Sequence, residues 1–101
     1  MNYNYLDDSG YPTEECLDKI KNWKIDNNNL RDIMEFIKPV WKYADCGYWT
    51  EENGRYLIST GGWSGNEEII DYMHQNFLLW MLYWEQSRRG GHYIFSKRSI
   101  E

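Results

Sequence analysis

The chain has 101 residues, a length that suits one domain with a single hydrophobic core. Hydrophobic residues make up 42% and aromatic residues 18% of the chain, which excludes a disordered acidic protein and predicts a core rich in tryptophan and tyrosine. A formal charge of -5 disfavours direct binding to a nucleic acid backbone and suits docking onto a basic surface.

The N-terminal segment, the longest apolar run and the cysteines indicate the cellular compartment. The N-terminal segment MNYNYLDDSG has neither the basic region nor the apolar stretch of a secretory signal, and the best apolar run, 77–84, is far shorter than the ~20 residues of a membrane span. Cys16 and Cys46 lack CxxC spacing, and His74 and His92 complete no metal-ligand pattern with them. We therefore expect a cytoplasmic protein with reduced thiols and without membrane contact, metal or cofactor.

The N-terminal third is expected to contain an arm and a short helix. Residues 1–11 show no period and are interpreted as an arm that packs through Tyr3, Tyr5 and Leu6. A helix is predicted over 13–23, with Thr13 as its N-cap, because apolar residues then recur at helical spacing.

The middle of the chain predicts a second helix and a β-hairpin. Apolar residues from Leu30 onward follow the i, i+3, i+4, i+7 pattern of a helix, and Pro39 should end its regular part near Ile37 or Lys38. Strand-forming residues lie on both sides of the turn 51–54, which contains Asn-Gly, a pair that tolerates positive φ in tight turns.

The third helix is expected to be one long rod over 66–86. Its apolar residues cover a wide face, which implies burial on two sides. Ser64 and Glu67 have the spacing of a capping box, with Asn66 as an alternative cap. A final strand is predicted over 92–95.

These elements define a single domain, residues 1–101, of the α+β class in the order α-α-β-β-α-β, followed by a charged tail at 97–101. A strand, a helix running back and another strand place the last strand parallel to the second. The sheet is therefore predicted to be three-stranded and mixed, in the order 2-1-3 or 1-2-3, with the long helix packed against it.

Two candidate binding segments lie at opposite ends of this predicted sheet, about 30 Å apart along a helix of ~20 residues. At one end, backbone amides at a glycine-rich helix start attract anions, although the segment matches neither a Walker loop nor a dinucleotide fingerprint. A simpler interpretation is a tight turn and a helix cap. This segment consists of Gly61, Gly62, Trp63, Ser64, Gly65 and Asn66.

Trp63 has two interpretations within this glycine turn. Its ring is either pinned to the core or exposed as an interaction residue of the kind that interfaces favour.

The second candidate segment comprises Arg88, Arg89 and His92, which are suited to hold a phosphate or carboxylate. The simpler interpretation is that the arginines pair with the C-terminal end of the long helix and with nearby glutamates. Arg55 is expected near the same end. No histidine is expected beside the hydroxyls of Ser59 and its neighbours, so the sequence does not predict an enzyme.

The segments STGGWSGNE and SRRGGHY, within a similarity covering roughly residues 9–96, resemble a group of short bacteriophage and prophage proteins of unknown function. The resemblance implies a viral setting, with the host cytoplasm as its compartment, and transfers no site. By analogy, we expect a non-enzymatic accessory protein that binds a host macromolecule, with a protein as the expected partner and inhibition of a host or defence factor as one consequence. Two alternatives remain open: a small anion- or nucleotide-binding protein using the turn amides, and a homodimer formed through an exposed edge strand or leftover aromatic surface.

Overall fold

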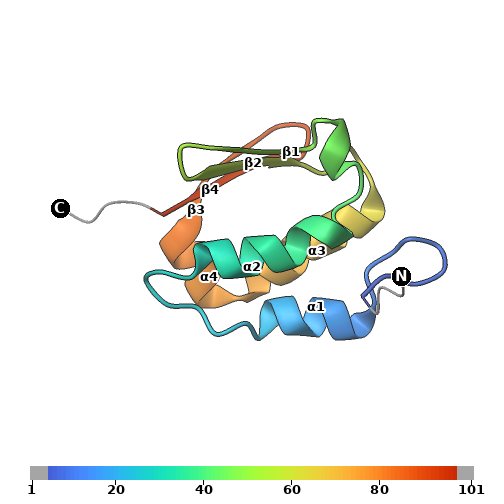
Figure 1. Ribbon diagram of the computed structural model, residues 1–101, viewed down its shortest axis with the longest axis horizontal. Helices are drawn as coiled ribbons and strands as arrows, with labels where there is room; N and C mark the ends of the chain where they lie inside the picture. Colours follow the sequence, from blue (N-terminus) through green and yellow to red (C-terminus); the bar gives the residue numbers. More distant parts are fainter. Residues whose placement is uncertain (1–4, 98–101) are drawn as a thin grey trace.

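The computed structural model describes residues 5–97 and has an α+β fold (Figure 1). Four α-helices and a four-stranded antiparallel sheet make up the described part of the chain. The helices are α1 (Glu14–Lys21), α2 (Leu30–Ile37), α3 (Ser64–Gln75) and α4 (Phe77–Tyr83), with short 3-10 turns η1 (Lys38–Val40) and η2 (Ala44–Cys46). The strands are β1 (Trp49–Glu52), β2 (Arg55–Ser59), β3 (Trp84–Arg88) and β4 (His92–Ser96).

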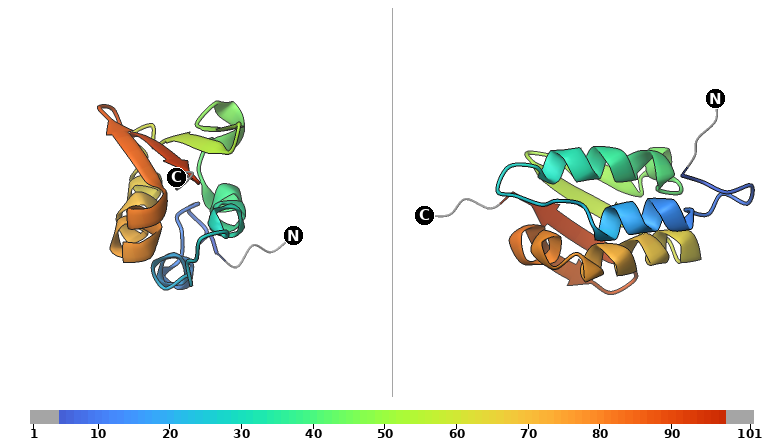
Figure 2. Two further views of the ribbon diagram at one scale, coloured as in Figure 1. Left: turned by 90° about the vertical axis from the view of Figure 1, so that its left-hand side faces the viewer. Right: turned by 90° about the horizontal axis from the view of Figure 1, so that it is seen from below.

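All four α-helices lie on one face of the sheet (Figure 2, left). The helix α2 and the pair α3 and α4 lie next to the sheet, and α1 lies farthest from it. We call the face that carries the helices the covered face and the opposite one, which carries no α-helix of residues 5–97, the open face. Successive side chains of a strand point to opposite faces, so each strand contributes to both.

The local signals of the first half of the chain are confirmed. The Thr13 hydroxyl accepts a hydrogen bond from the Cys16 amide at 3.1 Å and caps α1. The helix α2 ends at Ile37, where η1 with Pro39 takes over. Asn53 and Gly54 have φ of 54° and 76° and form a two-residue turn, with β1 and β2 paired directly from Glu52 and Arg55.

The predicted rod over 66–86 is wrong. The helix stops at Gln75, and Asn76 adopts an extended conformation with φ -84° and ψ 95°. Its side-chain oxygen accepts from the Leu79 amide and caps α4, while its nitrogen donates to the carbonyls of Ile20 and Trp23 at 3.0 Å each. The break is therefore stabilised by contacts to the end of α1, which a local pattern cannot reveal.

The predicted sheet is also wrong in its number of strands, its order and its direction. Residues assigned to the end of the rod form β3, and the sheet has the order β1-β2-β4-β3 with every pair antiparallel. The chain turns from β3 to β4 through a short loop in which Gly90 and Gly91 have φ of 88° and 81°. Glycine here serves a β-hairpin and not the end of a helix.

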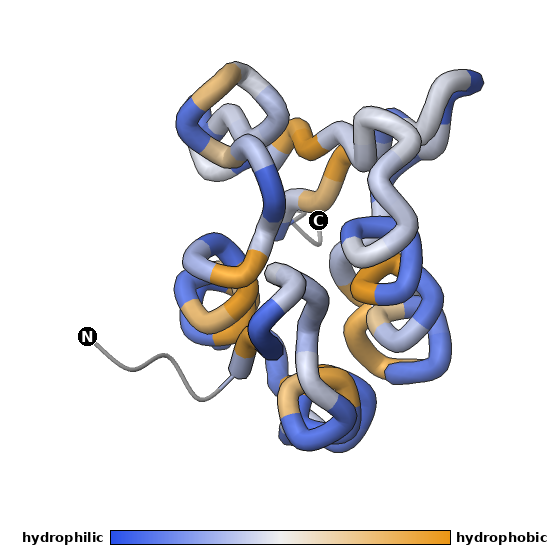
Figure 3. Tube along the Cα trace, turned by 90° about the vertical axis from the view of Figure 1, so that its right-hand side faces the viewer, coloured by the Kyte–Doolittle hydropathy of each residue, from blue (hydrophilic) through white to orange (hydrophobic). Residues whose placement is uncertain are grey.

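The core lies between the covered face and the helices. Figure 3 shows the apolar residues of the helices turned towards the space between them. Residues that are at most 1% exposed include Ile20, Ile33, Met34, Ile37, Ile58, Ile69, Met73, Leu79 and Phe95.

The arm and the tail are partly described. Tyr5 and Leu6 pack against the core as predicted, and the Tyr5 ring meets Phe36 at 4.9 Å between centroids. Tyr3 and residues 98–101 of the predicted tail lie outside the described residues. Between residues 5 and 97, no helix has the length and apolar character that crossing a membrane requires.

Candidate binding site where two glycine turns meet

The two candidate segments lie side by side, which corrects the prediction that they occupy opposite ends. Ser59 is paired with His92 in the β2–β4 register, and the Thr60 amide donates to the Gly91 carbonyl at 2.9 Å. The turn after β2 therefore contacts the turn between β3 and β4. Because β3 runs back along β4 as a hairpin, the double arginine returns to the end of the sheet where α3 begins.

Glycine is required where the two turns touch. At Gly91, a Cβ atom would overlap the Thr60 hydroxyl, and φ is +81°. At Gly61, a Cβ would overlap the ring of Tyr48, and φ is +63°. Both positions combine a left-handed backbone with a close neighbour, so a larger residue at Gly91 would push the two turns apart and one at Gly61 would displace the Tyr48 ring.

A hydroxyl and an imidazole form a direct contact at this junction. Ser59 Oγ lies 2.6 Å from His92 Nδ1, and either atom is the donor depending on the tautomer of the ring. Both residues belong to the open face. They line a hollow of about 270 Å³ together with Gly47, Thr50, Leu57, Ile58, Arg88, Tyr93 and Ile94.

Arg88 completes the polar side of the hollow. It is paired with His92 in the β3–β4 register and is exposed. When the Gln86 amide is oriented to satisfy both side chains, its oxygen accepts from Arg88 Nε at 2.6 Å and from an Arg88 terminal nitrogen at 3.1 Å. Gln86 thereby orients the guanidinium without neutralising it.

Among residues 5–97, the positive charge at this end of the sheet has no carboxylate partner. Within residues 5–97, the ion pairs are Arg31–Glu35 and Arg55–Glu85, at 2.9 and 2.8 Å. Arg88 and Arg89 thus form no salt bridge there, and they follow a strand and not the end of a helix. The predicted pairing of these arginines with a helix end and with glutamates is therefore wrong.

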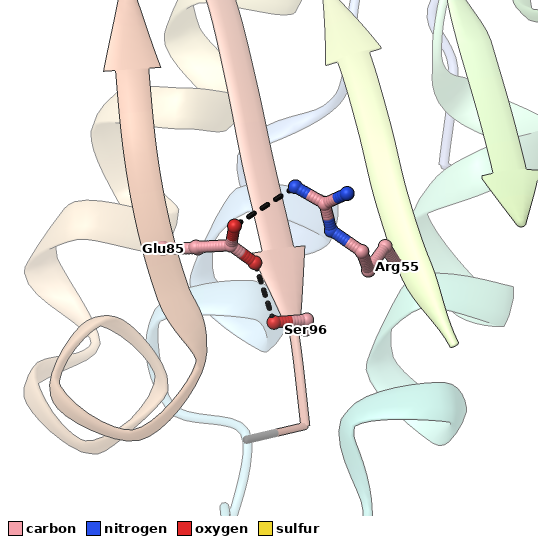
Figure 4. A network of polar contacts seen from close by, with 3 residues as sticks. All are labelled: Arg55, Glu85 and Ser96. Atoms are coloured by element: carbon pink, nitrogen blue, oxygen red, sulfur yellow. Dashed lines mark hydrogen bonds and ion pairs between the residues drawn. The ribbon is translucent and has the colours of Figure 1, made fainter. Parts of the chain in front are cut away.

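Arg55 lies at the other end of the sheet, which corrects its expected place beside the double arginine. Its guanidinium reaches Glu85 on β3, and the other carboxylate oxygen of Glu85 accepts from the Ser96 hydroxyl at 2.8 Å (Figure 4). This network joins β2, β3 and β4 across the open face. The Arg55 charge is already neutralised by an acidic side chain, unlike that of Arg88.

Trp63 is pinned and only half-buried. Its ring lies 4.6 Å from that of Tyr11 between centroids, and the Lys42 ammonium lies 4.9 Å from its centroid. On a third side, a Cβ at Gly65 would come within 2.7 Å of the indole nitrogen. The arm and the chain after η1 thus hold the ring, which favours the first of its two interpretations.

The predicted capping box is absent from the start of α3. Ser64 is already helical, and its hydroxyl donates to the Tyr11 hydroxyl at 3.1 Å. Glu67 instead accepts from the Thr60 hydroxyl at 3.3 Å. Asn66 is buried and bridges two segments, since its oxygen accepts from the Lys42 amide and its nitrogen donates to the carbonyls of Lys42 and Thr60.

The turn amides are also partly engaged. Gly62 donates to the Thr60 hydroxyl at 3.3 Å, and Trp63 donates to the Thr60 carbonyl at 3.0 Å. The donors that face solvent at this end are therefore chiefly the side chains of Arg88, Arg89 and His92. Such a set can hold an anionic oxygen by charge-assisted hydrogen bonds.

The sequence reasoning missed Ser59 and Gln86 as site residues because it placed His92 at the wrong end of the sheet. The available signal was the double glycine after a run of strand length, which suits a hairpin as well as a helix end. Comparisons with protein-family models, curated proteins and solved structures found no match to this chain.

Proposed function

We propose that this protein binds a host protein without catalysing a reaction, and that an acidic group of the partner docks at Arg88, His92 and Ser59. The observation that supports this function is the unneutralised guanidinium of Arg88 beside the Ser59–His92 pair, on the rim of a hollow in the open face. The host is inferred from the resemblance to bacteriophage proteins, and inhibition of a host or defence factor would be the consequence of such binding.

An acidic partner suits the chemistry of the hollow. A carboxylate or phosphate on the partner would receive hydrogen bonds from the Arg88 guanidinium and from one member of the Ser59–His92 pair, because the bond between these two side chains uses one of their two donors when the ring is neutral. The apolar side chains of Leu57 and Ile94 supply a floor for the rest of the bound segment. Charge at the rim selects the partner and accelerates its encounter, while the apolar floor adds buried area.

A binding role is favoured over catalysis at the Ser59–His92 pair. A nucleophilic serine needs a base that a third group orients, usually a carboxylate on the second ring nitrogen. Within residues 5–97, the His92 ring makes no hydrogen bond besides that to the Ser59 hydroxyl, and Glu67 accepts from the Thr60 hydroxyl. We therefore expect no serine labelling by a fluorophosphonate probe at Ser59, measured by mass spectrometry of the intact protein.

A small anion or nucleotide is the second candidate ligand. It is favoured by the contact between the two turns, which places the start of α3 at the same end of the sheet as Arg88. It ranks second because Thr60 already engages the amides of Gly62 and Trp63. A nucleotide would therefore find fewer free donors in the turn than a bare glycine loop offers.

The test measures fluorescence anisotropy with a short labelled peptide that contains glutamate and phosphoserine. We expect saturable binding that Arg88→Gln weakens by roughly tenfold or more, as loss of a charge-assisted hydrogen bond predicts. Arg31→Gln is the matched control, because it removes the same charge from an exposed position on α2 and should leave binding unchanged.

A thermal-shift series with inorganic phosphate and nucleotides separates the two candidates. Saturable stabilisation by these small anions, lost in Arg88→Gln, would replace the acidic peptide by a small anion as the ligand. Absence of binding to both the peptide and the small anions would refute the proposed role of this site.

A further inference from the structure

A second hollow, of about 370 Å³, lies between α3 and the β3–β4 hairpin on the covered side of the sheet. The helix α3 and the edge strand β3 lie at the same side of the molecule (Figure 2). The hollow is separate from the candidate site on the open face. Its lining residues are Glu67, Ile70, Asp71, His74, Trp80, Ser87 and Tyr93.

Two carboxylates give this hollow a negative charge. Glu67 and Asp71 lie one turn apart on α3 and are both exposed, and no lysine, arginine or histidine of residues 5–97 pairs with either within 4 Å. Glu67 accepts from the Thr60 hydroxyl, and Asp71 accepts from Gln75 at 3.4 Å. Like charges at this spacing repel each other, so a cation between them would be stabilised by both.

Aromatic rings form the other wall of the hollow. The ring of Trp80 is half-buried, and it lies 4.5 Å from His74 and 6.3 Å from Tyr93 between centroids. Trp84 also stacks on Trp80, at 5.9 Å between centroids and with an interplanar angle of 11°. Aromatic faces beside carboxylates attract guanidinium and ammonium groups. The wall and the acidic helix therefore select the same kind of side chain.

The strand β3 supplies an unpaired backbone edge along this hollow. It is the last strand of the sheet order, and no strand of the described chain pairs with its outer side. Ser87 of β3 lines the hollow, so side chains on that side of a neighbouring strand would point into it. Addition of an extended peptide to an exposed edge is a common mode of recognition, with pockets that read alternate side chains.

We propose that an extended basic segment of a partner protein pairs with β3 and places an arginine or lysine side chain in the hollow between Glu67, Asp71 and Trp80. The charges of Glu67 and Asp71 identify the side chain that enters the hollow as basic, and the net charge of -5 favours its approach. This surface extends beyond the proposed function, because it lies on the covered side of the sheet and binds a group of the opposite charge.

The experiment uses anisotropy with a short fluorescein-labelled peptide of alternating arginine and valine. Two comparison peptides replace every arginine by glutamate or carry N-methyl groups on alternate backbone amides. We expect binding of the first peptide only, because N-methylation removes donors that pair with β3 and glutamate reverses the charge. The affinity should fall steeply with added salt.

Charge variants locate the bound side chain. The double variant Glu67→Gln/Asp71→Asn should lower the affinity for the arginine peptide by roughly tenfold or more. The matched double variant Glu68→Gln/Asp45→Asn removes the same charge from exposed positions outside the hollow and should bind like the wild type. Glu67→Gln/Asp71→Asn should bind the acidic peptide like the wild type, because neither residue lines the hollow of the open face, and this separates the inference from the proposed function.

Three results would overturn the inference. They are absence of binding of the arginine peptide, equal losses in both double variants, and equal binding of the N-methylated peptide. The second would indicate diffuse attraction to an acidic protein, and the third would exclude pairing with the edge of β3.

Discussion

The two faces of the sheet are formed by alternate residues of the same strands, yet they have opposite characters. The covered face carries Tyr56, Ile58 and Phe95, each at most 5% exposed, beneath the helices. The open face carries the Ser59–His92 pair and the Arg55–Glu85–Ser96 network. Each set is bonded internally, and no α-helix of residues 5–97 covers either of them. The fold therefore depends on the covered face, whereas the open face is available for binding.

The largest difference between the faces is expected from truncating Phe95. Phe95→Ala should reduce the free energy of unfolding by about 3–5 kcal/mol, because the side chain is fully buried and leaves a cavity. Leu57→Ala on the open face should reduce the free energy of unfolding by about 1 kcal/mol, since the Leu57 side chain is already partly exposed. Urea unfolding measures both. Similar losses would mean that the open face is packed against something in solution.

A smaller effect is expected where the two turns touch. Gly91→Ala should destabilise the protein by about 2 kcal/mol, because a methyl group overlaps the Thr60 hydroxyl and φ is positive. Gly62→Ala is the control, since its φ is also positive but its Cβ would meet nothing within 4 Å. Equal losses of stability in the two variants would show that the contact between the turns contributes little.

The two cysteines are expected to differ in thiol reactivity, because one is buried in the core and the other is exposed. Burial raises the pKa of Cys16 from 9.0 to about 11, whereas Cys46 is exposed. Titration with a thiol reagent near pH 8 should label Cys46 rapidly and Cys16 only after unfolding.

The same pKa shift predicts how stability depends on pH. Below pH 9 the Cys16 thiol is protonated in both the folded and the unfolded chain. Between pH 9 and about 11 the unfolded chain loses this proton first, so stability falls with rising pH, and Cys16→Ala should reduce that slope. An unchanged slope in the variant would assign the loss to other groups.

The smallest effect on stability is expected at Arg88. Arg88→Gln should change the free energy of unfolding by less than about 0.5 kcal/mol, because the side chain is exposed and forms no salt bridge within residues 5–97. Its effect on binding the acidic peptide should be much larger. A large loss of stability would instead make Arg88 a structural residue of the hairpin.

The sequence predicted those elements whose causes are local. Thr13 caps a helix, Pro39 ends one, and Asn53 with Gly54 forms a turn, each through its own backbone or side chain. The α+β class and the order of the first two helices and strands follow from such signals. The protein partner, the viral setting and a homodimer remain predictions.

The later half of the chain was mispredicted because its causes lie far away in the sequence. Residues 77–84 are apolar on all sides, so their period does not distinguish the end of a helix from the start of a strand. The strand β3 is defined by pairing with β4, and the break at Asn76 by bonds to α1. With β3 misassigned, Arg88 and His92 were placed away from Ser59, and the candidate site was divided.

The bonds from Asn76 to Ile20 and Trp23 join residues more than fifty positions apart. They can form only after α1 has docked, so until then the break at Asn76 lacks its two bonds to the end of α1 and the helix favoured locally over residues 66–83 is less strongly opposed. Refolding followed by far-UV circular dichroism should therefore pass through a stage with more helical signal than the native state. Asn76→Ala should prolong that stage. The side-chain amide of Asn76 would then affect the rate of folding as well as the stability of the native state.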